Sequence, residues 1–263
     1  MPDDLIAQLG DELFDALRAR RTLAPLTARH AGITINDAYR VSLHFLRRRE
    51  SAGERVIGKK IGVTSKAVQD MLGVFQPDFG FLTEAMRVMD GATVSLAQSG
   101  LIQPRAEGEI AFVLRSGLKG PGITRDDVLA ATDYVAPCFE IVDSRIADWK
   151  IRIEDTVADN ASCGVFVVGP QRIDPTALDL AAVAMTMEKN GVPCGAGLGS
   201  AVQGHPAEAV AWLANTLGAY GIPFNAGETI LSGSLAPLVP AAAGDRFTMR
   251  IGGLGGCSVA FAV

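Results

Sequence analysis

Histidine and cysteine are scarce in this sequence, and their scarcity argues against several kinds of site. The chain has 263 residues, of which three are histidine and four are cysteine. The histidines are not spaced as a short zinc motif requires, and no two cysteines form a Cys-x-x-Cys pair. We therefore expect no zinc site of this type, and we expect the reduced thiols of a cytoplasmic protein.

Blocks of positive charge and long apolar runs are also missing. The net charge is −5, and the one basic run is Arg47 to Arg49, which we expect to be the solvated end of a helix. Nucleic acid is therefore not an expected partner. No apolar run approaches the ~20 residues that span a membrane. The acidic start, Met1 to Asp4, does not resemble a signal sequence.

Two familiar glycine or serine motifs are incomplete. The segment from Gly195 to Gly199 lacks the third glycine of a dinucleotide-binding loop, and a turn at Asn190-Gly191 precedes it where a strand should be. There is no Gly-x-Ser-x-Gly segment of the serine hydrolase type. The sequence therefore predicts neither nicotinamide or flavin binding nor a serine nucleophile.

The apolar content supports a sizeable core, since 48% of the residues are hydrophobic and 20% are charged. Helical periodicity is concentrated in the first third, and strand-like runs follow it. This order is typical of an α+β fold. Helices are expected at 4–20, from Asn36 or Asp37 to 50, 65–71, from Thr124 onward, and 206–217; strands are expected at 56–63, 110–114, 134–142, 178–188, 229–231, 246–251 and 257–263.

Carboxylates in or beside the apolar strands are the first candidate site. Glu107 and Glu109 precede an apolar run, and side chains two apart on a strand share a face. A solvated strand end would also explain this pair. Glu140, however, lies within the apolar run 134–142, where a free acid is unusual. Together the three would form an all-oxygen triad, which suits Mg²⁺ or Mn²⁺ better than zinc.

Two further polar positions are ambiguous from the residues alone. Lys59 and Lys60 are adjacent on one predicted strand, so one of them is expected to point inward. Asp78 lies in the turn-like segment 76–80, where aspartate often has a structural role because it bonds its own backbone. A neighbouring lysine would keep Asp78 ionised at neutral pH.

Several long motifs resemble one family. The segments 58–66, 76–80, 105–110, 140–150 and 155–162 are similar to those of the 2-hydroxypenta-2,4-dienoate hydratases of aromatic meta-cleavage pathways, within the fumarylacetoacetate hydrolase superfamily. The resemblance implies a mixed β-roll with flanking helices around a divalent-metal site. It also implies a single catalytic domain over 1–263, with a helical N-terminal segment (1–55) and a β-rich metal-binding core (56–263).

The resemblance assigns roles position by position. The family's metal ligands match Glu107, Glu109 and Glu140. Its active-site lysine matches Lys60, its active-site aspartate matches Asp78, and Ser162 falls in the stretch that lines the substrate pocket. The implied enzyme is a hydro-lyase that uses Mg²⁺ or Mn²⁺ to add water to a small dienoate, giving 4-hydroxy-2-oxopentanoate.

Two alternatives remain open at this point. One is 4-oxalocrotonate (2-oxo-3-hexenedioate) decarboxylase, in which we expect a non-acidic residue at the position of Asp78. The other is a non-catalytic partner subunit of such an enzyme. The resemblance also implies a homo-oligomer and a complex with the decarboxylase. A hydrolase is not favoured, because no histidine lies between His44 and His205.

Overall fold

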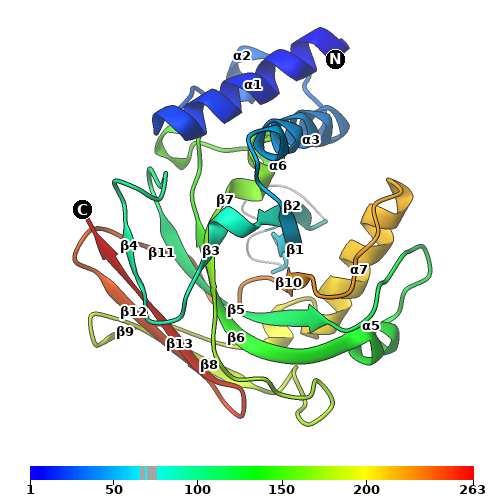
Figure 1. Cartoon of the computed structure of the whole chain (residues 1–263), viewed down its shortest axis with the longest axis vertical. Helices are drawn as coiled ribbons and strands as arrows, with labels where there is room; N and C mark the ends of the chain where they lie inside the picture. The colour runs from blue at the N-terminus through cyan, green and yellow to red at the C-terminus, as the bar shows by residue number, and fades with distance from the viewer. Residues whose placement is uncertain (66–68, 70–75) are drawn as a thin grey trace.

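The N-terminal helices lie over one end of a curled layer of strands in the computed structural model, which describes residues 1–65, 69 and 76–263 (Figure 1). The helix predicted over 65–71 lies mostly outside the described residues. Other helices are α1 (Asp3–Ala19), α2 (Leu26–Arg29), α3 (Ile35–Ser51), α5 (Arg125–Ala131), α6 (Ile153–Ala158) and α7 (Pro206–Ala219). The predicted α+β order and mixed β-roll are confirmed.

The N-terminal helices form the cover of the roll. Helix α1 buries Leu9 and Leu13, which recur every four residues on one face. Helix α3 begins after Thr34, whose hydroxyl accepts a hydrogen bond from the Asp37 N–H, while the Asp37 carboxylate accepts one from the Thr34 N–H. The predicted cap at Asn36 or Asp37 was therefore wrong, because Asp37 occupies the third helical position of this capping box.

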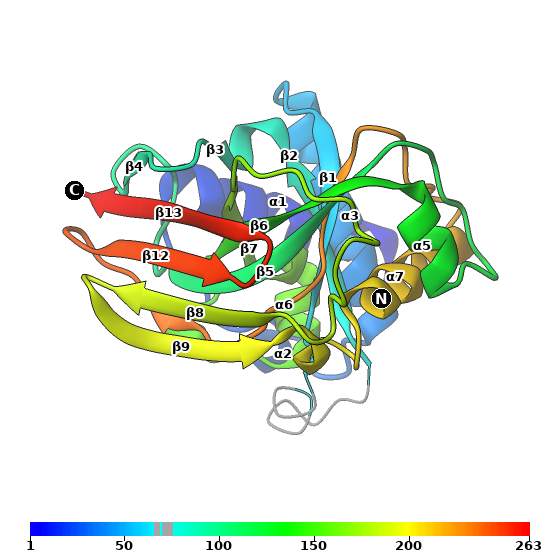
Figure 2. The same cartoon turned by 90° about the horizontal axis from the view of Figure 1, so that it is seen from below.

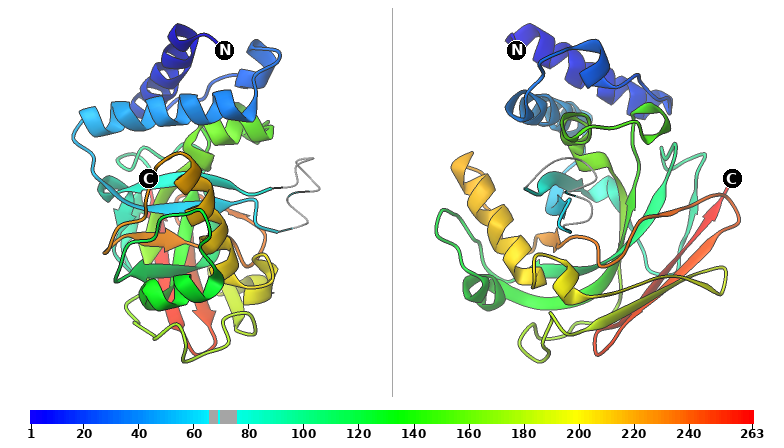
Figure 3. Two further views of the ribbon diagram at one scale, coloured as in Figure 1. Left: turned by 90° about the vertical axis from the view of Figure 1, so that its right-hand side faces the viewer. Right: turned by 180° about the vertical axis from the view of Figure 1, so that it is seen from behind.

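The larger sheet has the order β2-β1-β10-β5-β6-β7-β3, with β11 paired to β5. Most neighbours are antiparallel, but β1–β10 and β3–β7 are parallel, so the sheet is mixed. Figure 3 shows its strands curling beneath α1 and α3. The strands are β1 (Val56–Gly62), β2 (Asp78–Thr83), β3 (Arg87–Val88), β5 (Arg105–Leu114), β6 (Thr132–Val142), β7 (Cys163–Val168), β10 (Thr229–Leu231) and β11 (Val239–Pro240).

A second sheet, ordered β4-β13-β12-β8-β9, packs against the outside of the first (Figure 2). The second sheet approaches β5 closely at Gly108, where a Cβ would lie 2.5 Å from the Met249 sulfur and would force that side chain to shift. Strand β8 begins later than predicted, and β9 was not predicted. The bounds are β4 (Thr93–Ser95), β8 (Ala184–Lys189), β9 (Val192–Leu198), β12 (Arg246–Ile251) and β13 (Gly255–Ala262).

The basic run at the end of α3 is only partly solvated. Arg49 is buried, and its guanidinium donates hydrogen bonds to the Glu54 carboxylate and to the Thr83 hydroxyl. The prediction of a solvated basic end was therefore wrong for Arg49, because its charge is buried and paired with Glu54 in the segment that follows α3. No helix in the described part of the chain is long and apolar enough to cross a membrane.

Candidate metal centre and active site

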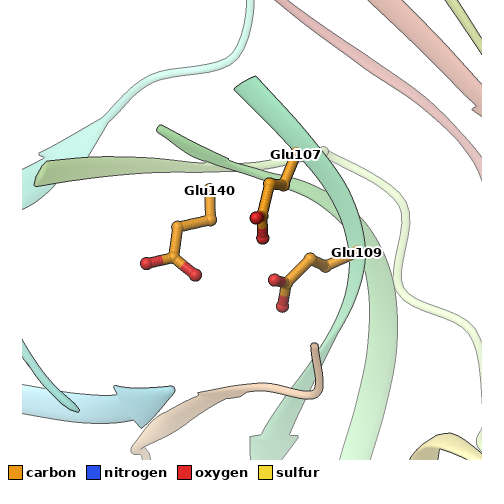
Figure 4. Close-up of side chains that lie close together, drawn as sticks. All are labelled: Glu107, Glu109 and Glu140. Atoms are coloured by element: carbon orange, nitrogen blue, oxygen red, sulfur yellow. The ribbon is translucent and has the colours of Figure 1, made fainter. Parts of the chain in front are cut away.

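Three glutamates from two paired strands meet inside the roll. Glu107 on β5 is directly opposite Glu140 on β6, and Glu109 is two residues further along the same face of β5. Each contributes an oxygen to a cluster whose atoms all lie within 4.8 Å of one another, as Figure 4 shows. Glu109 and Glu140 have no exposed surface, so a solvated strand end does not describe them.

Burial leaves these carboxylates short of partners. Among the described residues, neither oxygen of Glu140 accepts a hydrogen bond, and Glu109 has one unpartnered oxygen. The other Glu109 oxygen accepts the Gly233 N–H at 2.8 Å. Burial, followed by the charge of Glu140, raises the pKa of Glu107 to about 8, and the same two causes raise the pKa of Glu109.

The residues present fit a hard divalent cation. A cation would satisfy the unpartnered oxygens and remove the repulsion among three clustered carboxylates. The donor set is all oxygen, and it contains none of the nitrogen or sulfur ligands that structural zinc sites favour. Two of the three histidines have other contacts: His44 bonds Asp11, and His205 caps α7.

Lys60 faces the glutamates from the opposite side of the roll. It lies on β1, it is buried, and its Nζ is 3.2 Å from Glu140 Oε1. Burial acts to lower the pKa of Lys60, but the charges of Glu140 and Asp78 outweigh it and raise that pKa. The ammonium group therefore stays protonated at neutral pH.

Lys59 does not point into solvent. The two lysines alternate faces as predicted, but both are buried, and Lys59 forms an ion pair with Glu228 on the other side of the sheet. Its ammonium group also lies 5.2 Å from the centre of the Phe224 ring. The expectation of one inward lysine was therefore incomplete, because the outer face of β1 is itself covered.

Asp78 begins strand β2 and lies beside Lys60. It is paired with Gly62 in the β1–β2 register, and a Cβ on Gly62 would be 2.2 Å from Asp78 Oδ1 and 3.3 Å from Lys60 Nζ. Glycine at 62 thus makes room for both charged groups. Burial is the largest cause and raises the pKa of Asp78, while the charge of Lys60 acts to lower it. The expected ionisation of Asp78 at neutral pH stays a prediction.

Ser162 lies in the short 3₁₀ segment η3 (Asn160–Ser162) between α6 and β7. It is buried, its hydroxyl lies 3.1 Å from the Thr156 hydroxyl, and its carbonyl accepts the Asp143 N–H at 2.7 Å. Among the described residues, no hydrogen bond joins its side chain to the glutamates or to Lys60. Its role at the substrate stays a prediction.

One partner of the triad was missed in the sequence, namely the Gly233 N–H that bonds Glu109. Gly233 follows β10 with φ 109°, and a Cβ there would lie 2.4 Å from the Thr64 hydroxyl oxygen. The available signal was a run of small residues, Ser232 to Ser234, directly after a strand. A glycine in such a run often marks a close backbone approach.

The match to a family model covers most of the chain. The model described as "Fumarylacetoacetate (FAA) hydrolase C-terminal" matches residues 55–261. The chain belongs to this family. The family that the motifs predicted is thereby confirmed, including the β-rich segment that holds the three glutamates.

Relatives in the family carry hydratase names. The chain is 74% identical over 252 residues to 2-hydroxyhexa-2,4-dienoate hydratase of Comamonas testosteroni, covering 96% of each chain. It is 60% identical over 222 residues to 2-hydroxypent-2,4-dienoate hydratase of Pseudomonas putida, covering 84% of this chain and 100% of that one. The predicted class of reaction agrees with these names.

Solved relatives of the same fold hold divalent metals. The chain superposes on 4-oxalocrotonate decarboxylase from Pseudomonas putida G7, complexed with magnesium and adipate, with a TM-score of 0.95 and 37% identity over 99% of this chain and 98% of that one. It matches fumarylpyruvate hydrolase from Pseudomonas aeruginosa, in complex with Mn²⁺ and pyruvate, with a TM-score of 0.63. That match covers 78% and 88% of the two chains and, at 16% identity, shows the fold alone.

Removing one carboxylate should weaken cation binding. We expect Glu109→Gln to lower Mn²⁺ affinity by ~10-fold or more, by comparison with losses of ~10–100-fold when ligand-supporting groups are removed. Calorimetric titration of metal-free protein measures this without reference to activity. Glu188→Gln, at an exposed position of β8, is the control and should bind normally. Equal affinity in the two variants would contradict the metal assignment.

The two lysines should separate catalysis from stability. Lys60→Met should lower kcat by ~10²-fold or more, the size of effect seen when one electrostatic stabiliser is lost. Lys59→Met should instead leave the buried Glu228 carboxylate without its cation, with hydrogen bonds from Asn225 alone among the described residues, and lower the free energy of unfolding by roughly 3–5 kcal/mol.

Denaturant unfolding and turnover per folded molecule distinguish the two lysine variants. Turnover that falls equally in both would mean that the outer face of β1 also contributes to the reaction.

Proposed function

We propose that this protein is a divalent-metal-dependent hydratase that adds water to 2-hydroxypenta-2,4-dienoate to give 4-hydroxy-2-oxopentanoate. The observation that carries this proposal is the buried pair of Lys60 and Asp78, held beside a cluster of three glutamates. Such a site offers a fixed positive charge, a proton carrier and hard oxygen ligands close together inside the roll. The hydratase names of the relatives at 74% and 60% identity agree with this reaction.

The reaction needs proton movement and charge balance, and the chain offers one group for each. The dienol loses its 2-hydroxyl proton and gains one at its terminal carbon; water then adds as hydroxyl at C4 and proton at C3. Asp78, whose pKa is raised by burial, would move a proton on the substrate or on water. Lys60, which stays protonated, would balance negative charge on the carboxylate or the enolate oxygen.

Glu107, Glu109 and Glu140 would hold Mg²⁺ or Mn²⁺. When bound, the cation would supply a Lewis acid and a template for the substrate carboxylate and 2-oxygen. Ser162 would line the substrate pocket and offer its hydroxyl there. All three glutamates project from two adjacent strands, so the ligand positions are fixed by one β-ladder.

A second substrate follows from the names of the relatives. The 74% identical relative is named for 2-hydroxyhexa-2,4-dienoate, which has one more carbon than the pentadienoate. The same water addition would give 4-hydroxy-2-oxohexanoate. We therefore propose the longer dienoate as the second candidate substrate of the same site.

The alternatives are kept as experimental outcomes. A decarboxylase would release carbon dioxide from 2-oxo-3-hexenedioate, and a non-catalytic partner subunit would turn over neither compound alone. We also propose a cytoplasmic homo-oligomer that associates with 4-oxalocrotonate decarboxylase, on the basis of the family resemblance.

Turnover by the purified protein should identify the reaction. With Mg²⁺ or Mn²⁺ present, we expect loss of dienoate ultraviolet absorbance with both substrates. Their kcat/KM values should differ by no more than about 200-fold, the usual limit for one methylene. Chelation should abolish the signal, and added metal should restore it. Faster carbon dioxide release from 2-oxo-3-hexenedioate would instead indicate the decarboxylase, and no turnover would indicate the partner subunit.

Asp78 should be required for hydration but not for metal binding. Asp78→Asn keeps the size of the side chain and removes its titrating proton, so hydration should fall by ~10²–10⁴-fold, the usual range for general acid–base catalysis. Mn²⁺ affinity should be unchanged, because Asp78 is not one of the clustered glutamates.

Asp133→Asn, at an exposed position of β6, is the matched control for Asp78→Asn. Hydration rate, Mn²⁺ affinity and melting temperature are measured on both variants. A large drop in melting temperature with normal turnover per folded molecule would make Asp78 a structural residue.

A further inference from the structure

On its open side, the backbone of edge strand β2 is hydrogen-bonded by a side chain and not by another strand. β2 ends the strand order of the larger sheet, so in the described structure one side of its backbone has no strand partner. The amide of Asn160 lies on it: Asn160 Oδ1 accepts the Phe81 N–H at 2.8 Å, and Asn160 Nδ2 donates to the Phe81 C=O at 3.0 Å. An amide can imitate a strand because it carries both a donor and an acceptor.

The turn that carries Asn160 lies directly against β2. A Cβ on Gly80 would be 2.4 Å from the Asn160 carbonyl oxygen, so the approach requires glycine. Gly80 is paired with Lys60 in the β1–β2 register, and Asp78 is two residues away on the same face of β2. The contact is therefore adjacent to both groups that the proposed reaction uses.

The same turn has an unusual backbone. Asn160, Ala161 and Ser162 have φ values of 54°, 50° and 52°, in the left-handed region that side chains other than glycine seldom adopt. Three such residues in succession persist only where the surrounding contacts hold them, and strained segments of this kind cluster at functional sites.

A buried arginine holds both ends of this turn. Arg145 Nη2 donates to the Asp159 C=O at 2.8 Å, and Arg145 Nη1 donates to the Cys163 C=O at 3.1 Å. The Asp159 carboxylate accepts hydrogen bonds from Arg145 Nε and from the Arg145 backbone N–H, the latter at 2.8 Å. The Arg145 side chain is only 1% exposed, so this pairing replaces water almost completely.

We propose that Asn160 is a positioning residue for the reaction. It joins the segment between β6 and β7 to the edge of β2, and so holds Asp78 and Lys60 opposite Glu140. The glutamates need no such support, because β5 and β6 pair directly along their whole length. The inference rests on the proposed function for the roles of Asp78 and Lys60, but the joining of β2 to the turn is independent of it.

The substitution Asn160→Asp tests the proposal. It keeps the size of the side chain and the acceptor for the Phe81 N–H, but it places an oxygen against the Phe81 C=O where the donor was. We expect kcat per folded molecule to fall by about 10²-fold, the effect of misplacing a reacting group by about 1 Å. Mn²⁺ affinity should be unchanged, which a general loss of structure would not allow.

Asn215→Asp is the matched control. The Asn215 amide makes the same pair of bonds, with the Ile123 N–H and C=O, both at 2.8 Å, between α7 and the loop before α5. Losing that pair should lower stability by a similar amount. Hydration per folded molecule should stay at the wild-type value.

Hydrogen–deuterium exchange of residues 78–83 gives a readout that needs no substrate. This segment should exchange faster in Asn160→Asp than in Asn215→Asp, while residues 105–114 stay protected in both. Gly80→Ala places a methyl group against the Asn160 carbonyl and should also make residues 78–83 exchange faster. This variant replaces Asn160→Asp in the experiment if Asn160→Asp does not fold.

Equal exchange of residues 78–83 in Asn160→Asp and Asn215→Asp, or equal turnover per folded molecule, would overturn the proposal. If the wild-type protein does not hydrate the dienoate, the proposed function fails, and the exchange comparison still decides whether Asn160 holds β2.

Discussion

Repulsion among three clustered carboxylates, two of them fully buried, is the constraint on which the rest of this site depends. Glu107, Glu109 and Glu140 place oxygens within 4.8 Å of one another, and burial with the charge of Glu140 raises the pKa of Glu107 to about 8. Lys60 alone cannot balance three negative charges. Because ligand carboxylates must be ionised to bind a metal, the fully charged triad and a bound cation require each other.

The charged groups can come together because glycine residues lie where strands and turns approach one another closely. Gly62 leaves space for Asp78 and Lys60, Gly80 lets the 160–162 turn lie on β2, and Gly108 lets the second sheet pack behind the glutamates. At each position a Cβ would lie within about 2.5 Å of another atom, closer than packed atoms come. The geometry of the site therefore depends on these glycines as well as on the charged residues.

Local patterns in the sequence predict the part of the site that lies on the paired strands β5 and β6, namely the three glutamates. Alternation along β5 predicts a shared face for Glu107 and Glu109, and an acid inside an apolar strand singles out Glu140. Contacts between strands that are distant in the sequence cannot be predicted from the pattern of neighbouring residues. The sequence does not indicate an ion pair for Lys59, because its partner, Glu228, is distant in sequence. The segment around Asp78 resembles a turn in the sequence, and its pairing with β1 becomes evident only in the folded sheet.

The glutamates lie on the β5–β6 pair, whereas Asp78 lies on the edge strand β2. This separation suggests how related reactions can use one fold. The three glutamates project from β5 and β6, and the Gly233 N–H after β10 bonds Glu109, so these groups lie outside the strand that carries Asp78. Asp78 lies on the edge strand β2, which pairs with β1 and is bonded by the Asn160 amide and, through the Thr83 hydroxyl, by Arg49. Asp78 and the three glutamates thus lie on different strands, so a substitution at position 78 leaves the β5–β6 ladder and its carboxylates in place. The choice between proton transfer to carbon and loss of carbon dioxide is thus expected to reside in the wall that carries Asp78, and not in the metal centre.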